Sequence, residues 1–344
     1  DPHFSLRLAH ATALTVRRTV HLLPCRHFAA PTIRGDSSLS SMTFFSNGDT
    51  MTDENIANRT AVALGNFDGM HVGHMAVLEG AKSFQKDGLV PVAVLFDEHS
   101  MKAITGIAPP MLMTVGERNE YIIKKGLKLE TIIFNEIKNL SPEDFVEKIL
   151  VKKLRAGAVC CGYNYRFGKD AAGSAETMRK ICGRLGIKCK IAGEVDVAGH
   201  AVSSTQIRSL IENGETEKAN EMLGHKFGFS SPVIDGDKRG RRLGFPTINQ
   251  ELPQELVLPR FGVYRTDVTV GHRRYKGVTN IGKRPTVGTE KILSETYIID
   301  FDESIYGESV DIRLIKFIRP ERKFSSFDEL ARQIKTDAKE CADV

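Results

Sequence analysis

The sequence contains no run of about 18 apolar residues, which argues against a membrane-spanning helix. None of its six cysteines forms a CxxC pair, and no zinc-binding pattern is present. Basic and acidic residues are nearly balanced, with 48 Lys and Arg against 43 Asp and Glu. The resulting net charge of +5 suits anionic ligands but is too small to indicate nucleic-acid binding by itself. We therefore expect neither a membrane nor a nucleic acid among the partners, and the sequence leaves the oligomeric state open.

The N-terminal segment is poor in acidic residues. Before Met42 it contains only Asp1 and Asp36, together with five arginines and many Ser, Thr and Ala residues. This composition is typical of an organelle transit peptide. The alternative is an upstream stretch that is not native to the protein, with Met42 or Met51 as the true start. In either case we expect residues 1–57 to form an irregular, poorly ordered extension.

The cysteines favour a reducing compartment. Cys160 and Cys161 lie in an apolar run, where buried, reduced thiols are the simplest interpretation. We therefore expect a cytoplasmic protein, or an organellar one if residues 1–50 are a genuine transit peptide.

The chain length of 344 residues favours two domains, and strands alternate with helices through the first of them. Apolar runs predict strands at 60–64, 90–96, 130–134, 156–162 and 188–192. Periodicity and capping residues predict helices at 75–85, 114–125, from Ser141 onward, 174–185, from Ser203 or Ser204 to Asn213, and 216–223. This alternation predicts a parallel sheet with crossover helices, in which ligands bind beyond the carboxyl ends of the strands.

The pattern changes after Gly224 to short β-branched runs separated by Gly and Pro. Strands are expected within 261–270, 274–281, 295–301 and 310–317, followed by an amphipathic helix over 325–341. The second half is therefore predicted to be a small antiparallel β-barrel with a C-terminal helix.

The stretch Gly65–His74 lies between the first predicted strand and the first predicted helix. A helix N-terminus offers unpaired N–H groups and a positive dipole end, which suit a phosphate. His71 and His74, with Gly73 between them, can both face such a phosphate. The stretch is neither a GxxxxGK[ST] loop nor a GxGxxG loop. Histidine takes the place of the lysine of the GxxxxGK[ST] loop.

Two further segments are expected near the same end of the sheet. The loop Asn164–Lys169 combines aromatic residues with Arg166 and Lys169, which suits a flat anionic ligand, although it could also be an ordinary surface loop. The segment Val202–Arg208 places hydroxyls and an arginine at a helix start. It predicts either a second anion site or a simple helix N-cap.

The predicted barrel contains a basic, glycine-rich run, Gly236–Asn249. Such a loop can wrap phosphates, although a basic run is more often a solvated face. Thr247 and Asn249 are two residues apart on an extended segment, so their side chains point to the same side. Their oxygens could hold Mg²⁺, which prefers oxygen ligands.

These motifs, in this order, resemble the bifunctional riboflavin kinase/FMN adenylyltransferase (FAD synthetase) family of bacteria. The resemblance covers about residues 60–341 and rests on Gly65–His74, Val202–Arg208 and Gly240–Asn249. It implies an α/β nucleotidyltransferase-like domain at 58–223 for FMN adenylylation, followed by a riboflavin kinase domain at 224–344. ATP would be the co-substrate of both reactions, and Mg²⁺ the cofactor; riboflavin, FMN and FAD would be the other ligands.

In the first domain, the resemblance implies that His71, His74 and Arg208 act on the ATP phosphates during adenylyl transfer. Asn164 and Arg166 would contact the flavin. The remaining ATP or phosphate contacts implied for this domain are Gly65, Asn66, Phe67, Asp68, Gly69, Gly73, Ser204 and Thr205.

In the second domain, Glu295 would be the base that accepts the riboflavin hydroxyl proton. Thr247 and Asn249 would hold Mg²⁺. The phosphate loop would include Gly240, Arg241, Gly244 and Pro246. Two alternatives remain, namely that only one activity is retained or that the chain is a flavin-binding regulator, which would not need His71, His74 or Glu295.

Overall fold

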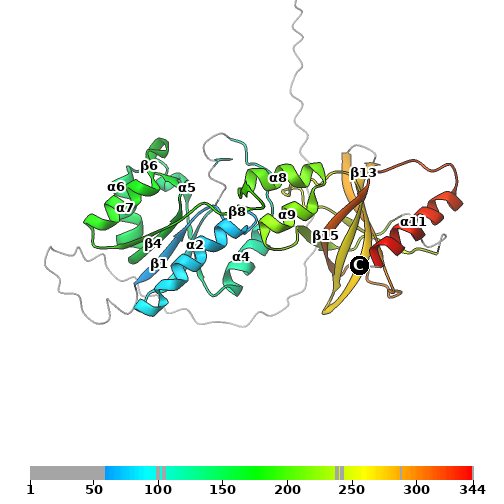
Figure 1. Cartoon of the computed structure of the whole chain (residues 1–344), viewed down its shortest axis with the longest axis horizontal. Helices are drawn as coiled ribbons and strands as arrows, with labels where there is room; N and C mark the ends of the chain where they lie inside the picture. The colour runs from blue at the N-terminus through cyan, green and yellow to red at the C-terminus, as the bar shows by residue number, and fades with distance from the viewer. Residues whose placement is uncertain are drawn as a thin grey trace, which may run out of the picture. The chain divides into compact units, whose positions relative to one another are not determined.

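The computed structural model describes residues 59–97, 101–102, 106–236, 240, 244–286 and 289–342. The N-terminal extension predicted at 1–57 lies outside this range. The described chain begins with a parallel sheet and continues into an antiparallel barrel with a C-terminal helix, which confirms the predicted fold class (Figure 1). Within these residues, no helix is long and apolar enough to cross a membrane.

The parallel sheet has five strands in the order β3-β2-β1-β4-β7. Their bounds are β1 Thr60–Leu64, β2 Val90–Phe96, β3 Lys128–Ile132, β4 Ala156–Gly162 and β7 Lys188–Ala192. Four of them match the predicted strands, whereas β3 lies two residues earlier than predicted. The strand order reverses between β1 and β4, and in open parallel sheets a ligand crevice forms at such a reversal.

Helices connect these strands, and two more, α8 and α9, follow β7 and lead to the barrel. Their bounds are α2 Val72–Lys82, α4 Val115–Lys124, α5 Phe134–Ile137, α6 Pro142–Asp144, α7 Ala175–Arg184, α8 Ser204–Asn213 and α9 Thr216–Leu223. The π-helix is η2 Phe145–Lys153, and the 3-10 segments are η1 Ser83–Asp87 and η3 Lys169–Ala171. Small hairpins are β5 Arg166–Phe167 with β6 Gly173–Ser174, and β8 Asp196–Val197 with β9 His200–Ala201.

Serine or threonine caps begin four of these helices, three of them as predicted. Thr114 and Glu117 form the predicted capping box of α4, and Ser141, Ser174 and Ser203 cap α6, α7 and α8.

Two helix predictions are wrong in detail. The first helix begins at Val72 and not at Met75, because the His71 side chain caps it. The segment after Ser141 is not a regular α-helix: the short α6 is followed by the π-helix η2, whose backbone bonds run from i to i+5 and which buries Phe145, Val146 and Leu150.

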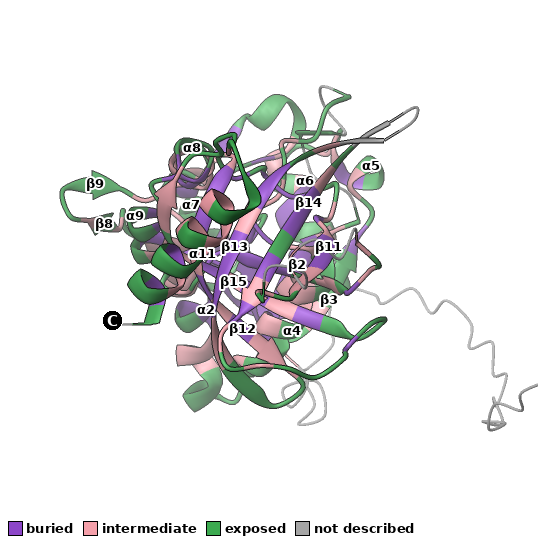
Figure 2. Ribbon diagram, turned by 90° about the vertical axis from the view of Figure 1, so that its right-hand side faces the viewer, coloured by how far each residue is buried: buried purple, intermediate pink, exposed green. Residues whose placement is uncertain are grey.

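The barrel is a six-stranded antiparallel sheet in the order β10-β15-β12-β13-β14-β11. Its elements are β10 Gly228–Pro232, β11 Thr247–Glu251, β12 Gly262–Val270, β13 Arg273–Thr286, β14 Thr289–Ile298, β15 Ser309–Arg319 and the C-terminal helix α11 Phe327–Ala342. An isolated bridge between Ile234 and Asn249 brings the edge strands together, so the sheet nearly closes. Buried positions run along β13 and β14 (Figure 2).

The core of the barrel continues into α8 and α9. Ile207 and Ile211 of α8 and Leu223 of α9 belong to the same buried cluster as Tyr264 and Ile312 of the barrel. The two faces of the parallel sheet have separate clusters of their own. The first residue of α8, Ser204, donates a hydrogen bond to the Asp68 carbonyl in the turn after β1, while the apolar face of α8 packs on the barrel.

Candidate active sites

The turn after β1 has an unusual backbone. Phe67, Gly69 and Met70 have φ values of 52°, 79° and 44°, in the left-handed region that non-glycine residues rarely adopt. Phe67 and Met70 are fully buried, so core packing holds them in this conformation. A Cβ atom on Gly69 would lie 2.7 Å from the Cβ of Leu112, so only glycine fits there. The turn is thus fixed by its surroundings before it reaches α2.

His71 and His74 stack at the start of α2. Their ring centroids are 3.6 Å apart, with an interplanar angle of 16°. His71 Nδ1 accepts a hydrogen bond from the backbone N–H of His74 at 3.2 Å, which places the proton of a neutral His71 on Nε2. A Cβ atom on Gly73 would lie 3.2 Å from the His71 ring, so glycine leaves room for this arrangement.

Both imidazoles are uncharged at neutral pH. Burial lowers the pKa of His71 to about 4, and the nearby His225 adds to this effect. Burial also lowers the pKa of His74 well below its usual range, assisted by His71. The pair therefore offers neutral N–H donors to an incoming anion, whose charge would in turn raise both pKa values.

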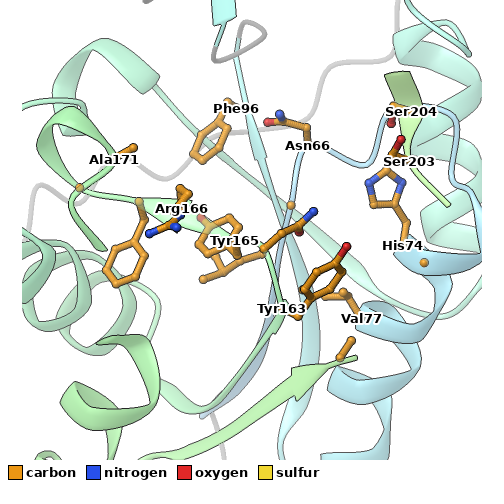
Figure 3. A pocket seen from close by; sticks show the side chains of 18 of the residues that line it. Asn66, His74, Val77, Phe96, Tyr163, Tyr165, Arg166, Ala171, Ser203 and Ser204 are labelled. Atoms are coloured by element: carbon orange, nitrogen blue, oxygen red, sulfur yellow. The ribbon is translucent and has the colours of Figure 1, made fainter. Parts of the chain in front are cut away.

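A cavity of about 870 Å³ lies at the carboxyl ends of β1 and β4, where the strand order reverses (Figure 3). It brings together eight of the predicted site residues: Gly65, Asn66, His71, Gly73, His74, Asn164, Arg166 and Ser204. His74, Ser203 and Ser204 lie on one side of the cavity, and Phe96, Tyr165 and Arg166 lie on the other. The volume is in the range of small-molecule sites.

The other predicted residues of this half do not line the cavity. They are Phe67, Asp68, Gly69, Thr205 and Arg208. Asp68 is only 3% exposed; it accepts hydrogen bonds from the Leu112 N–H at 2.8 Å and from Arg208 Nη2 at 2.5 Å. Arg208 Nε donates to the Pro110 carbonyl at 2.6 Å. This ion pair joins the turn after β1 to the first turns of α8.

Sequence reasoning missed several residues at this site. Phe96, the last residue of β2, and Phe134, the first residue of α5, line the cavity. Tyr163 follows β4, and its hydroxyl donates to Glu194 at 2.6 Å. Phe96 and Phe134 end predicted strands and Tyr163 follows one, and these positions were an available signal. Arg118 of α4 donates to the Asn66 carbonyl at 3.4 Å, and no local motif marks it.

The second group of predicted residues lies on two paired barrel strands. Asn249 of β11 is the cross-strand partner of Glu295 on β14, and Asn280 of β13 is the partner of Glu295 on its other side. Glu295 is exposed, whereas Asn249 is 6% exposed. The buried Oδ1 of Asn249 has no hydrogen-bond partner within the described part of the chain. Thr247 projects to the same side as Asn249.

The basic loop before β11 is described only in part. Arg241 lies outside the described residues, whereas Gly240 accepts a hydrogen bond from the Phe245 N–H at 2.9 Å and Gly244 has a φ of 80°. Pro246 and Thr247 line a small cavity of about 180 Å³ against the segment after β14. In the described residues, no cluster of three or more His, Cys, Asp and Glu side chains forms a metal site.

Comparison with known proteins identifies both halves. A family model described as riboflavin kinase matches residues 223–344, and one described as FAD synthetase matches residues 53–206. The chain is 34% identical to the bifunctional riboflavin kinase/FMN adenylyltransferase of Listeria monocytogenes, over 83% of this chain and 92% of that protein. It is 33% identical to the protein of the same description from Escherichia coli K12, over 80% and 90% of the two chains. This chain belongs to the bifunctional riboflavin kinase/FMN adenylyltransferase family.

The two family models separate the two groups of residues. His71, His74 and most of the larger cavity lie within the FAD synthetase match, and Thr247, Asn249 and Glu295 lie within the riboflavin kinase match. A crystal structure described as a macrolide-efflux protein from Streptococcus pneumoniae is also similar, with a TM-score of 0.76 and 30% identity. It covers 83% of this chain and 95% of its own. Both domains of a two-step flavin cofactor synthesis are therefore present in one chain.

Proposed function

We propose that the larger cavity is the site at which FMN attacks the α-phosphate of ATP, forming FAD and releasing pyrophosphate. The observation that carries this assignment is the stacked His71–His74 pair at the start of α2, on the cavity wall. The helix N-terminus and two neutral N–H donors suit the charge that develops on the departing pyrophosphate. No covalent enzyme intermediate is needed, because positioning and electrostatic stabilisation suffice.

The remaining contacts of this half divide into two kinds. Gly65, Asn66, Gly73 and Ser204 line the cavity and are assigned to the nucleotide, whereas Asn164 and Arg166 are assigned to the flavin. Phe67, Asp68 and Gly69 act by shaping the turn, since they do not line the cavity. Thr205 does not line the cavity either, and we assign it to the phosphate site because it lies in the first turn of α8.

Arg208 combines the two kinds of role. Asp68 and Pro110 engage two of its nitrogens. Arg208 does not line the cavity of the free chain, and we assign its remaining Nη1 to a phosphate of bound ATP.

We infer that the row of side chains on β11 and β14 phosphorylates riboflavin. The exposed Glu295 carboxylate accepts the proton of the ribityl hydroxyl as this oxygen attacks the γ-phosphate of ATP. The buried Asn249 Oδ1, which has no hydrogen-bond partner among the described residues, and the Thr247 hydroxyl fit a magnesium ion, since Mg²⁺ takes oxygen ligands. When bound, Mg²⁺ supplies charge stabilisation at the phosphates. Gly240, Arg241, Gly244 and Pro246 form the loop that holds them.

We place both reactions in the cytoplasm, where ATP is available and thiols stay reduced. The five cysteines of the described chain are free, which supports this location. No nucleic-acid or membrane partner is included in the proposal.

Two variants test the assignment. His74→Ala should lower FAD formation from FMN by about 10²–10³-fold, as loss of a transition-state donor does, while riboflavin phosphorylation stays intact. Glu295→Gln should remove FMN formation from riboflavin and leave FAD formation from added FMN unchanged. Both are measured by chromatography of the flavins. FAD formation at the wild-type rate in His74→Ala, or loss of both activities in Glu295→Gln, would refute the corresponding role.

A further inference from the structure

His225 connects the two halves of the molecule at the turn after β1. It follows Gly224, which ends α9, and it precedes the first barrel strand. Its Nε2 lies 2.9 Å from the carbonyl oxygen of Gly69, a residue 156 positions earlier in the chain. Its Nδ1 lies 3.3 Å from the carbonyl oxygen of Lys226. A side chain from the riboflavin kinase half thus contacts the turn that carries the chain to His71.

The direction of this hydrogen bond follows from its partner. A carbonyl oxygen only accepts, so the bonded ring nitrogen carries the proton. Burial lowers the pKa of His225, so the ring is neutral at pH 7 and has a single N–H. The contact to Gly69 is the shorter of the two, which places the proton on Nε2.

The accepting carbonyl occupies a sensitive place in the turn. The Gly69 carbonyl belongs to the peptide that joins two left-handed residues, Gly69 and Met70, immediately before His71. Rotation of this peptide would redirect the first residue of the histidine pair. Asp68, on the preceding peptide, is held by Arg208, Leu112 and Ser204. The bond from His225 restrains the following peptide, which those three contacts do not reach.

His225 is itself fixed in position. Its ring lies 5.5 Å from the Tyr121 ring of α4. The Phe227 N–H donates to Asn220 Oδ1 at 2.7 Å, which ties the segment after His225 to α9. A Cβ atom on Gly224 would lie 2.9 Å from Val72 Cγ1, so the chain passes close to the start of α2. The imidazole therefore acts as a rigid support.

We propose that His225 is a positioning residue for adenylyl transfer: its Nε2–H holds the Gly69 carbonyl and so orients His71 and His74 from the kinase half of the chain. This inference rests on the function proposed above for the larger cavity. It does not place His225 in contact with ATP or FMN. The kinase reaction, at Thr247, Asn249 and Glu295, does not depend on this bond.

Three substitutions at one position separate this role from simple packing. In Gln, the amide nitrogen is as many bonds from Cα as His Nε2, so His225→Gln can keep the donor. In Asn, the nitrogen corresponds to Nδ1, so His225→Asn cannot reach Gly69 in the same way. His225→Ala removes the donor altogether. Lys226→Ala is the matched control, because its exposed side chain bonds to Asp267 and not to the turn.

The experiment measures kcat and KM for FAD formation from FMN and for FMN formation from riboflavin. His225→Ala should lower kcat for FAD formation about tenfold, the effect of losing one hydrogen bond, with KM for ATP little changed. His225→Gln should recover to within about twofold of wild type, and His225→Asn should not. FMN formation should stay within about twofold in every variant, which also reports that the chain is folded.

Three results would overturn the inference: full activity in His225→Ala, equal recovery by Asn and Gln, or a parallel fall in both reactions. If His225→Ala does not fold, the comparison of Gln with Asn decides alone. Failure of wild type to form FAD from FMN would refute the proposed function. If wild type forms FAD from FMN and all three His225 variants do so at the same rate, only the role of His225 would be refuted.

Discussion

The two histidines at the start of α2, which we assign to the ATP phosphates, carry no charge of their own at neutral pH. Burial lowers the pKa of both side chains, and His71 further lowers the pKa of His74. A neutral pair avoids two cations in contact, yet it can gain a proton once phosphates arrive. At the residue scale, binding of an anion would therefore raise both pKa values and favour proton uptake by the pair.

The lowered pKa of His71 also makes the stability of the folded chain depend on pH. The pKa of His71 is 6.5 in the unfolded chain and about 4 in the folded one, so the unfolded state binds more protons between these values. The stability contribution of neutral His71 is complete above pH 6.5 and is lost as pH falls toward 4. His71→Asn removes this dependence while Asn still caps α2.

We expect wild type to lose about 2 kcal/mol more stability than His71→Asn between pH 7 and pH 5. Urea unfolding of both proteins at the two pH values measures the difference. Parallel losses in the two proteins would show that His71 is not held neutral by burial.

The ion pair between Asp68 and Arg208 gives a second prediction at this scale. Asp68→Asn keeps an oxygen for the Leu112 N–H but removes the charge that orients Arg208. FAD formation from FMN should fall at least tenfold, since a misplaced catalytic contact costs about this much or more. FMN formation should be unchanged. An Asp68→Asn variant that forms FAD at the wild-type rate would contradict the role given to this pair.

The sequence predicts part of the residue-scale picture. The spacing of His71, Gly73 and His74 indicated a shared phosphate site, and all three line one cavity. It did not predict that the Asp68 side chain is buried, because the residue types in a tight turn do not show which side chains face the core. The contact of His225 could not be predicted either, because its partner, the Gly69 carbonyl, is 156 positions away in the sequence.

At the scale of elements, the C-terminal helix α11 is attached to the barrel by a buried ion pair. Asp337 is 2% exposed and accepts hydrogen bonds from Arg319 Nη2 at 2.7 Å and Nε at 3.1 Å. Gln333 also donates to Asp337, at 2.6 Å. Removing one member of such a pair leaves a buried charge without compensation.

Asp337→Ala should therefore lower the free energy of unfolding by about 3–5 kcal/mol. The exposed Glu340, on the same helix, provides the control, and Glu340→Gln should change stability by less than about 0.5 kcal/mol. Denaturant unfolding followed by circular dichroism measures both. A loss in Asp337→Ala no larger than in the control would mean that the pair does not anchor α11.

Elements with strong local signals could be predicted, and those defined by distant partners could not. Apolar runs marked β1, β2, β4 and β7, and hydroxyl or histidine caps set the helix starts. The strand β10, Gly228–Pro232, contains little apolar alternation and is a strand because β15 pairs with it. The π-helix η2 has i→i+5 backbone bonds, which an α-helical period of apolar residues does not predict.

At the scale of the whole molecule, the two ATP-dependent steps share a continuous core. The apolar side chains of α8 pack into the barrel cluster, while the first residues of α8 complete the larger cavity. The sequence predicted two halves from a change in periodicity near Gly224. It could not show this shared core, because the apolar residues of α8 do not indicate which distant residues they pack against.

Separate sites make a further prediction about mixtures. His74→Ala keeps the kinase residues, and Glu295→Gln keeps the adenylyl-transfer residues. Each variant alone should form little FAD from riboflavin, and an equimolar mixture should form FAD because FMN released by one is used by the other. If both variants retain their own half-reaction but the mixture forms no FAD, FMN does not pass between molecules through solution.

The most direct test of the account is a time course with the wild-type chain, riboflavin, ATP and Mg²⁺, followed by chromatography of the flavins. The account predicts that FMN forms first and FAD follows, and that added FMN is converted to FAD without riboflavin. FMN that accumulates without FAD would contradict the assignment of the larger cavity. Riboflavin that stays unconverted while added FMN yields FAD would contradict the assignment of the site on β11 and β14.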